Sequence, residues 1–238
     1  HCAEGIFNPG SISVAVGLTD LDGENGEVAV VENIAIHPNY GLSTYGYDFA
    51  LLKLKTALTA PTVDLIEIGD EALWDASSSA TILGWGRTSA TLPILPNILQ
   101  EAVIPIQSDD ECDDNLGRFF ESDSMVCAGV LEVTAGNADG VDTCNGDSGG
   151  PLLVQDGVNW KLVGLTSWGF ICGGPTYGVY SRVAAVLDWI QSIQFPPANI
   201  VAPTLNSDLF TSEFEIPVGA TLSCLGAEFV NADSISYS

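Results

Sequence analysis

Short apolar segments separated by turn residues run through most of this chain, and they constrain its fold more than any other feature. Each segment is rich in Val, Ile, Leu or aromatic residues, and Gly, Pro, Asn or Asp stand between the segments. Strands at this even spacing favour an antiparallel sandwich or barrel over βαβ units. The sequence therefore predicts an all-β fold, with strands within residues 11–18, 27–38, 48–54, 80–86, 99–106, 150–155, 160–168 and 177–183.

Two segments depart from the strand pattern and predict helices. Residues 108–120 begin with a serine followed by acids, which favours a helix start. Residues 184–194 space apolar side chains close to i, i+3, i+4, i+7, and the Pro-Pro pair that follows cannot continue a helix. We expect one domain over residues 1–194, a linker over 195–203, and a tail or the start of an unidentified module over 204–238.

Net charge and hydropathy exclude two classes of partner. The chain carries 31 acidic residues against six lysines and arginines, a formal net charge of −25. Such a surface repels phosphate backbones, so we expect no nucleic-acid partner. No run reaches the roughly 18 apolar residues that a membrane span needs, so we expect no membrane span.

The cysteines indicate disulfides in preference to a metal site. Their positions lack the paired C-x-x-C spacing that is typical of zinc sites. Disulfides form in oxidising compartments, so we expect a secreted, extracellular protein. The six cysteines are Cys2, Cys112, Cys127, Cys144, Cys172 and Cys224.

The segment "CNGDSGGP", residues 144–151, places a serine between glycines. A serine hydroxyl is a poor nucleophile unless a base takes its proton and donors stabilise the oxyanion that forms. Glycines on either side of Ser148 leave backbone N–H groups accessible, and those of Gly146 and Ser148 are the candidate oxyanion donors. By itself the segment is equally compatible with a glycine-rich turn that has no catalytic role.

The longer context resembles the chymotrypsin-like (trypsin-like) serine proteases. The segment "CNGDSGGP" is similar to the nucleophile loop of that family, and further motifs follow the family's order over residues 1 to about 194. They are "HC" at 1–2, "YDFALLKL" at 47–54, "GWG" at 84–86, "CAG" at 127–129, "SWG" at 167–169 and "YGVYSRV" at 177–183. The resemblance implies two six-stranded antiparallel β-barrels, the first of them incomplete here, and a C-terminal helix.

The resemblance also implies the catalytic roles. Ser148 is the expected nucleophile, His1 the general base and later the acid, and Asp48 the carboxylate that holds the imidazole in the right tautomer. The order His, Asp, Ser matches this family and differs from that of the α/β-hydrolases. The Ser167 hydroxyl is expected to support Asp48, and the backbone of Ser167, Trp168 and Gly169 to pair with an extended substrate.

Asp142 stands at the position that forms the bottom of the family's primary specificity pocket. A buried carboxylate there selects Arg or Lys side chains, and the small wall residues Gly169 and Gly178 leave the pocket open. Ile171 departs from the usual glycine and is expected to crowd the pocket mouth beside Phe170. We therefore expect hydrolysis after Arg or Lys, through an acyl-enzyme, with an altered profile.

The family pattern pairs Cys112 with Cys127 and Cys144 with Cys172. It leaves Cys2 and Cys224 without family partners in this chain, and we do not expect them to pair with each other. In the family, Asp147 pairs with the amino group released on activation. The resemblance therefore implies a zymogen, and we expect the 238-residue chain by itself to be inactive.

The sequence also bears on cofactors, on partners and on alternative functions. We expect no cofactor and no metal centre, although Tyr177 is a family position associated with Na⁺ and the acidic segment 20–27 is compatible with Ca²⁺. His37, in "IHPNY", is interpreted as a surface-turn residue without a role. The expected partners are protein or peptide substrates and macromolecular protease inhibitors. Two alternatives remain: an inactive homologue that serves as a binding or adaptor module, and an esterase-like hydrolase on another fold.

Overall fold

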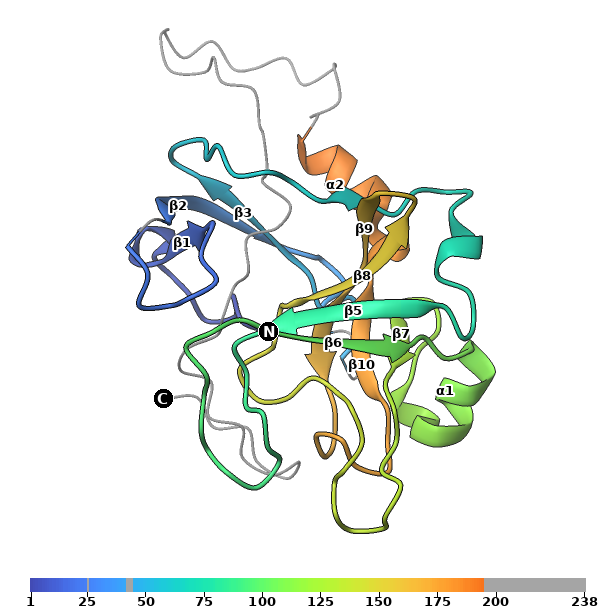
Figure 1. Cartoon of the computed structure of the whole chain (residues 1–238). Coiled ribbons are helices and arrows are strands. Elements are labelled where there is room, and N and C mark those ends of the chain that lie inside the picture. Colours follow the sequence, from blue (N-terminus) through green and yellow to red (C-terminus); the bar gives the residue numbers. More distant parts are fainter. Residues whose placement is uncertain (25, 42–44, 195–238) are drawn as a thin grey trace, which may run out of the picture.

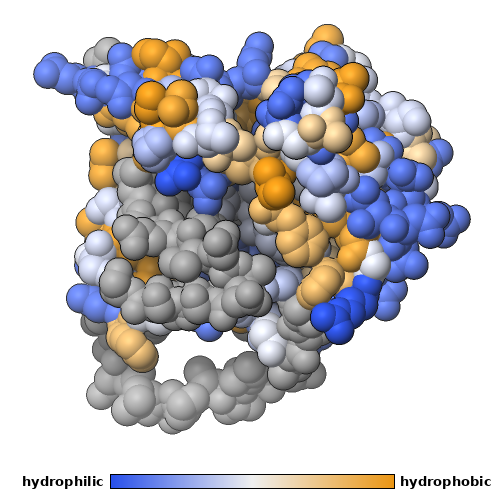
Figure 2. Space-filling view, turned by 90° about the horizontal axis from the view of Figure 1, so that it is seen from below, coloured by the Kyte–Doolittle hydropathy of each residue, from blue (hydrophilic) through white to orange (hydrophobic). Residues whose placement is uncertain are grey.

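The computed structural model describes residues 1–194, except residue 25 and residues 42–44. The described strands form two separate sheets, with short helices at the edge of the larger one (Figure 1). The predicted linker and tail, including Cys224, lie outside the described residues. Hydrophobic and hydrophilic residues are mixed on the face that Figure 2 shows, outside the grey residues.

The first sheet has three strands in the order β1-β2-β3, paired antiparallel. Its strands are β1 (Ser13–Val16), β2 (Glu27–Ile36) and β3 (Ala50–Leu54). Strand β1 alternates exposed and buried residues, as expected for a sheet with one solvated face. Val14, Val16 and Val31 form the small core of this sheet.

The second sheet contains six antiparallel strands in the order β6-β5-β8-β9-β10-β7, and a seventh, β4, beside β9. The predicted all-β class is thus confirmed, and each predicted strand is present. Two short strands were not predicted: β7, and β4, which pairs parallel with β9. The bounds are β4 (Asp64–Leu65), β5 (Ser79–Gly84), β6 (Gln100–Pro105), β7 (Met125–Ala128), β8 (Pro151–Asp156), β9 (Asn159–Trp168) and β10 (Gly178–Arg182).

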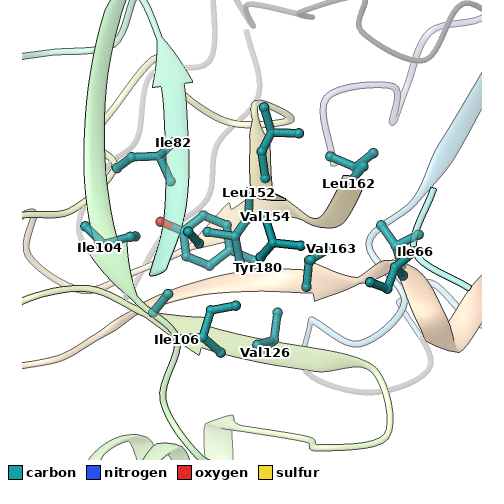
Figure 3. Packing of buried hydrophobic residues seen from close by; sticks show 14 of the residues in the cluster. Ile66, Ile82, Ile104, Ile106, Val126, Leu152, Val154, Leu162, Val163 and Tyr180 are labelled. Carbon is teal, nitrogen blue, oxygen red and sulfur yellow. The ribbon is translucent and has the colours of Figure 1, made fainter. Parts of the chain in front are cut away.

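The main core lies against this second sheet. The ring of Tyr180 on β10 lies among aliphatic side chains from other strands of the sheet, including Ile104, Val154 and Val163 (Figure 3). All four side chains are at most 1 % exposed. Full burial of an aliphatic side chain stabilises a fold by about 1.5–3 kcal/mol, so this cluster holds the loops at the strand ends in place.

Both predicted helices are present, and both are short. Helix α1 (Asp109–Leu116) begins as predicted, because the Ser108 hydroxyl accepts a hydrogen bond from the Glu111 N–H. Helix α2 (Leu187–Gln194) follows a 3₁₀ turn, η4 (Val183–Val186). The remaining 3₁₀ turns are η1 (Pro9–Ser11), η2 (Glu71–Leu73) and η3 (Gly117–Phe119). Within the described part of the chain, no helix has the length and apolar character to cross a bilayer.

Candidate active site

The Asp48 carboxylate is the meeting point of three distant segments. The Nδ1 atom of His1 lies 2.5 Å from Asp48 Oδ2, and the Ser167 hydroxyl donates to the same oxygen at 2.6 Å. The His1 backbone nitrogen also contacts Asp48 Oδ1. The Asp48 side chain is only 7 % exposed, so these partners replace the water that its charge would otherwise bind. An imidazole bonded to a carboxylate through Nδ1 presents Nε2 to a reactant.

Ser148 lies in a tight turn between β7 and β8 and is 4 % exposed. The turn is closed by hydrogen bonds from the Asp147 N–H to the Cys144 carbonyl at 2.9 Å, and from the Gly150 N–H to the Asp147 carbonyl at 2.8 Å. Gly146 has φ +100, a left-handed conformation that residues with a Cβ rarely adopt. The two predicted oxyanion donors therefore belong to one tight turn that needs a glycine at position 146.

Strand β9 connects this turn to Asp48. The N–H of Gly149 donates to the Thr166 carbonyl, and the N–H of Thr166 donates to the Gly150 carbonyl, both at 2.8 Å. The next residue, Ser167, donates its hydroxyl to Asp48. The end of β9 thus bonds to the Ser148 turn through its backbone and to Asp48 through a side chain. The turn that carries Ser148 and the Asp48 carboxylate, which are far apart in sequence, therefore both contact the end of this strand.

Asp147 is held beneath this turn. Its carboxylate accepts the Gly86 N–H at 2.7 Å and the Cys144 N–H at 2.9 Å. Burial raises the pKa of Asp147, and the two backbone donors oppose that shift. A Cβ at Gly84 would lie 1.9 Å from Asp147 Oδ1. The "GWG" motif therefore needs glycine at this position, because the Asp147 side chain packs against it. Sequence reasoning used "GWG" only as a landmark and missed this contact.

Asp142 is partly buried and lies next to Gly178 of strand β10. Its Oδ1 accepts the Thr143 N–H at 2.7 Å, and a Cβ at Gly178 would approach the same oxygen to 2.2 Å. Burial raises the pKa of Asp142 to about 7, because desolvation outweighs the hydrogen bonds that stabilise the carboxylate. Gly169 faces Gly178, since its Cβ would lie 3.9 Å from the Gly178 Cα. The structure thus places Asp142 beside Gly178, the wall glycine that Gly169 faces.

Aromatic side chains continue outward from the end of β9. The ring centroids of Trp168 and Phe170 lie 5.5 Å apart, and those of Phe170 and Phe119 lie 5.6 Å apart. Ile171, which follows Phe170, is 52 % exposed. Within the described residues, strands pair with Trp168 on one side only, through Val179 of β10.

Two disulfides hold the loops of this region, and both were predicted. Cys112–Cys127 ties α1 to β7, and Cys144–Cys172 ties the Ser148 turn to the segment after β9. Closing the 15-residue loop of the first is worth about 3 kcal/mol in the chain-entropy treatment. Cys2 is also disulfide-bonded, although the family pattern provides no partner for it in this chain. Cys224 lies outside the described residues.

The structure contradicts the interpretation of His37 as a surface-turn residue. His37 is 7 % exposed, so it is a buried residue and not a surface-turn residue. Its ring stacks on Tyr47, the residue before Asp48. Among the described residues no group of three or more His, Cys, Asp or Glu side chains is arranged to hold a metal ion. The hydroxyl of Tyr177, the position associated with Na⁺, lies 3.4 Å from Glu111.

A family model and several known proteins match this chain. The family model described as Trypsin matches residues 1–190. A trypsin of Saccharopolyspora erythraea is 40% identical over 189 residues, which cover 79% of this chain and 77% of that protein. Trypsin-1 of Astacus astacus is 36% identical over 198 residues, 81% of this chain and 80% of that protein. The human transmembrane protease serine 5 is 39% identical over 167 residues, 68% of this chain and 35% of that protein. The chain belongs to the trypsin family of serine proteases.

Proposed function

We propose that this protein is an endopeptidase in which Ser148 attacks the peptide carbonyl, His1 carries the proton and Asp48 orients His1. One observation carries the proposal: Asp48 lies between His1 Nδ1 and the Ser167 hydroxyl, while the strand that supplies Ser167 is bonded to the Ser148 turn. A serine whose proton passes to a histidine that a carboxylate orients is the machinery of nucleophilic acyl transfer.

Each group has a defined part in the reaction. His1 accepts the Ser148 proton at Nε2 as Ser148 Oγ bonds to the scissile carbonyl carbon, and the imidazolium is stabilised by Asp48. The backbone N–H groups of Gly146 and Ser148 donate to the oxyanion. His1 then protonates the leaving amine, which gives an acyl-enzyme, and a water molecule hydrolyses that ester by the same route in reverse.

We propose that the bond cleaved follows Arg or Lys. The Asp142 carboxylate is buried without a cation among its contacts in the described structure, so a guanidinium or ammonium group supplies the missing charge partner. Gly178 keeps the approach to Asp142 free of side-chain atoms. Ile171 narrows the mouth of this pocket and lowers turnover relative to a glycine at that position. The unpaired side of Trp168 accepts the substrate backbone as an added strand.

Secretion and activation by cleavage also belong to this proposal. The disulfides favour an oxidising compartment, which suits an extracellular protease. Asp147 is a buried carboxylate whose raised pKa reflects the cost of its charge, and an amino group released upstream would relieve that cost. The proposed activity then belongs to the protein after this cleavage.

The test uses the full-length protein, before and after activation. A fluorophosphonate probe is expected to label the activated protein at Ser148, and Ser148→Ala is expected to abolish labelling. Peptides that differ only in Arg, Lys, Phe or Ala before the scissile bond then report specificity. Arg and Lys peptides are expected to be cleaved at least a hundredfold faster than the others. Failure to label would favour a non-catalytic binding role, and equal cleavage of all four would refute the assignment of Asp142.

A further inference from the structure

We propose that His37 is a positioning residue for the reaction. It contacts the residues on both sides of Asp48 and packs against helix α2, and so holds the turn that carries Asp48 in place. His37 lies at the end of β2, outside the Asp48–Ser167 contacts described above. The inference rests on the proposed function, because it assigns His37 a part in orienting the proposed catalytic carboxylate.

The first contact holds the residue before Asp48. The imidazole of His37 stacks on the ring of Tyr47 with centroids 4.8 Å apart and an interplanar angle of 7°. Tyr47 has φ +55, a left-handed conformation that is unfavourable for an aromatic residue. Because such a backbone persists only where neighbouring contacts impose it, the stacked imidazole is a reason for it to persist here.

The second contact holds the residue after Asp48. The N–H of His37 donates to the Phe49 carbonyl at 2.9 Å, and the N–H of Phe49 donates to the Tyr47 carbonyl at 2.7 Å. The latter bond closes a three-residue turn with Asp48 at its centre. His37 therefore contacts both ends of the turn that carries the carboxylate.

The third contact fixes His37 itself. Trp189 of α2 meets the imidazole edge to face, with centroids 4.8 Å apart, and the Asn39 N–H donates to His37 Nδ1 at 3.2 Å. That bond requires a neutral ring at Nδ1, and burial lowers the pKa of His37, which favours the neutral form. The groups that face the ring in these contacts are two aromatic side chains and a backbone amide.

A displaced Asp48 weakens its bond to His1 Nδ1, and small displacements of a catalytic group reduce turnover by up to about a hundredfold. The effect falls on the chemical step, since none of these contacts involves the pocket around Asp142. A displaced carboxylate also stabilises the protonated imidazole of His1 less well.

Two substitutions separate the stack from the turn. His37→Asn keeps an oxygen that accepts the Asn39 N–H, as in an Asx turn, but removes the ring. His37→Phe keeps a ring on Tyr47 and loses the acceptor. In activated full-length protein we expect His37→Asn to lower kcat at least tenfold with KM changed less than twofold, and the acid limb of the kcat/KM profile to shift to lower pH. His37→Phe is expected to restore kcat to within threefold of the wild type.

Tyr47→Asn removes the tyrosine ring on which His37 stacks, and asparagine tolerates the left-handed backbone at position 47. The same kcat measurement is made on this variant if His37→Asn does not fold. Its effect on kcat and that of His37→Asn are expected to be non-additive in the double variant, because both remove one contact. Equal losses in His37→Phe and His37→Asn, or additive effects in the double variant, would overturn the proposal.

A readout without catalysis separates this inference from the proposed function. The proton between His1 Nδ1 and Asp48 gives a strongly downfield NMR signal when that bond is short. We expect the signal in the wild type and in His37→Phe, and its loss or marked upfield shift in His37→Asn. If the wild type cleaves no peptide, the proposed function fails, and the NMR comparison alone decides the role of His37. An unchanged signal in His37→Asn would contradict that role.

Discussion

Replacing Asp142 by asparagine is expected to stabilise the protein in a pH-dependent way. Burial raises the pKa of Asp142 from 3.8 to about 7, so the folded state holds this proton more tightly than the unfolded state. The stability contributed by the bound proton is therefore complete below about pH 4 and is lost as the pH rises to about 7. At about 1.4 kcal/mol per pH unit, the loss amounts to about 4 kcal/mol.

Asparagine removes this titration and keeps the local geometry, because its side-chain oxygen still accepts the Thr143 N–H. We expect Asp142→Asn to match the parent protein at pH 4 and to exceed its free energy of unfolding by about 4 kcal/mol at pH 8. Urea unfolding at both pH values measures the difference. A Ser148→Ala background prevents self-digestion during the experiment.

The matched control is Asp64→Asn, which removes one exposed negative charge from the same protein. It is expected to change stability by less than about 0.5 kcal/mol at either pH. A stability difference for Asp142→Asn that is equal at pH 4 and pH 8 would show that Asp142 is solvated, and it would refute the burial on which the specificity assignment rests.

Three further predictions concern binding and turnover. In the Ser148→Ala protein, the affinity for a small guanidinium ligand is expected to fall by up to tenfold per pH unit below about pH 7, because the ligand needs the ionised form of Asp142. Calorimetric titration at pH 5, 6 and 8 measures this affinity, and an affinity that does not change with pH would contradict the prediction. Ser167→Ala removes a charge-assisted hydrogen bond to Asp48 worth about 2 kcal/mol, so kcat is expected to fall about thirtyfold with KM unchanged. A rise in KM alone would instead indicate that Ser167 acts in substrate binding. Ile171→Gly is expected to raise kcat/KM for Arg peptides about fivefold, or about 1 kcal/mol, and a decrease would mean that Ile171 contacts substrate productively.

The strand pattern predicted the fold class because alternation and turn residues are local signals. Each predicted strand is present, and the helix at 108–120 begins at the serine that the sequence indicated. Strand β4 has two residues and pairs parallel with β9, so it lacks a local signature and depends on a partner almost a hundred positions later in the chain. Strand β7 is buried at each position and shows no alternation to detect.

The motifs predicted the members of the candidate site but only some of the residues that support them. Ser148, Asp48 and Ser167 were each identified from short motifs, and the structure brings the hydroxyl of Ser167 to Asp48. His37 was misinterpreted because a turn-like "IHPNY" segment says nothing about the rings that cover it. Those rings come from Tyr47 and from Trp189, about 150 residues away in the chain.

The sequence by itself determined which groups are available for chemistry and in which order they occur, because residue type and local spacing are written in the chain. Tertiary structure alone decided the environment of those groups. The burial that raises the pKa of Asp142 and the packing of Gly84 on Asp147 arise from contacts between segments far apart in sequence. Desolvation and packing depend on everything that surrounds a group, and no short stretch of sequence contains that information.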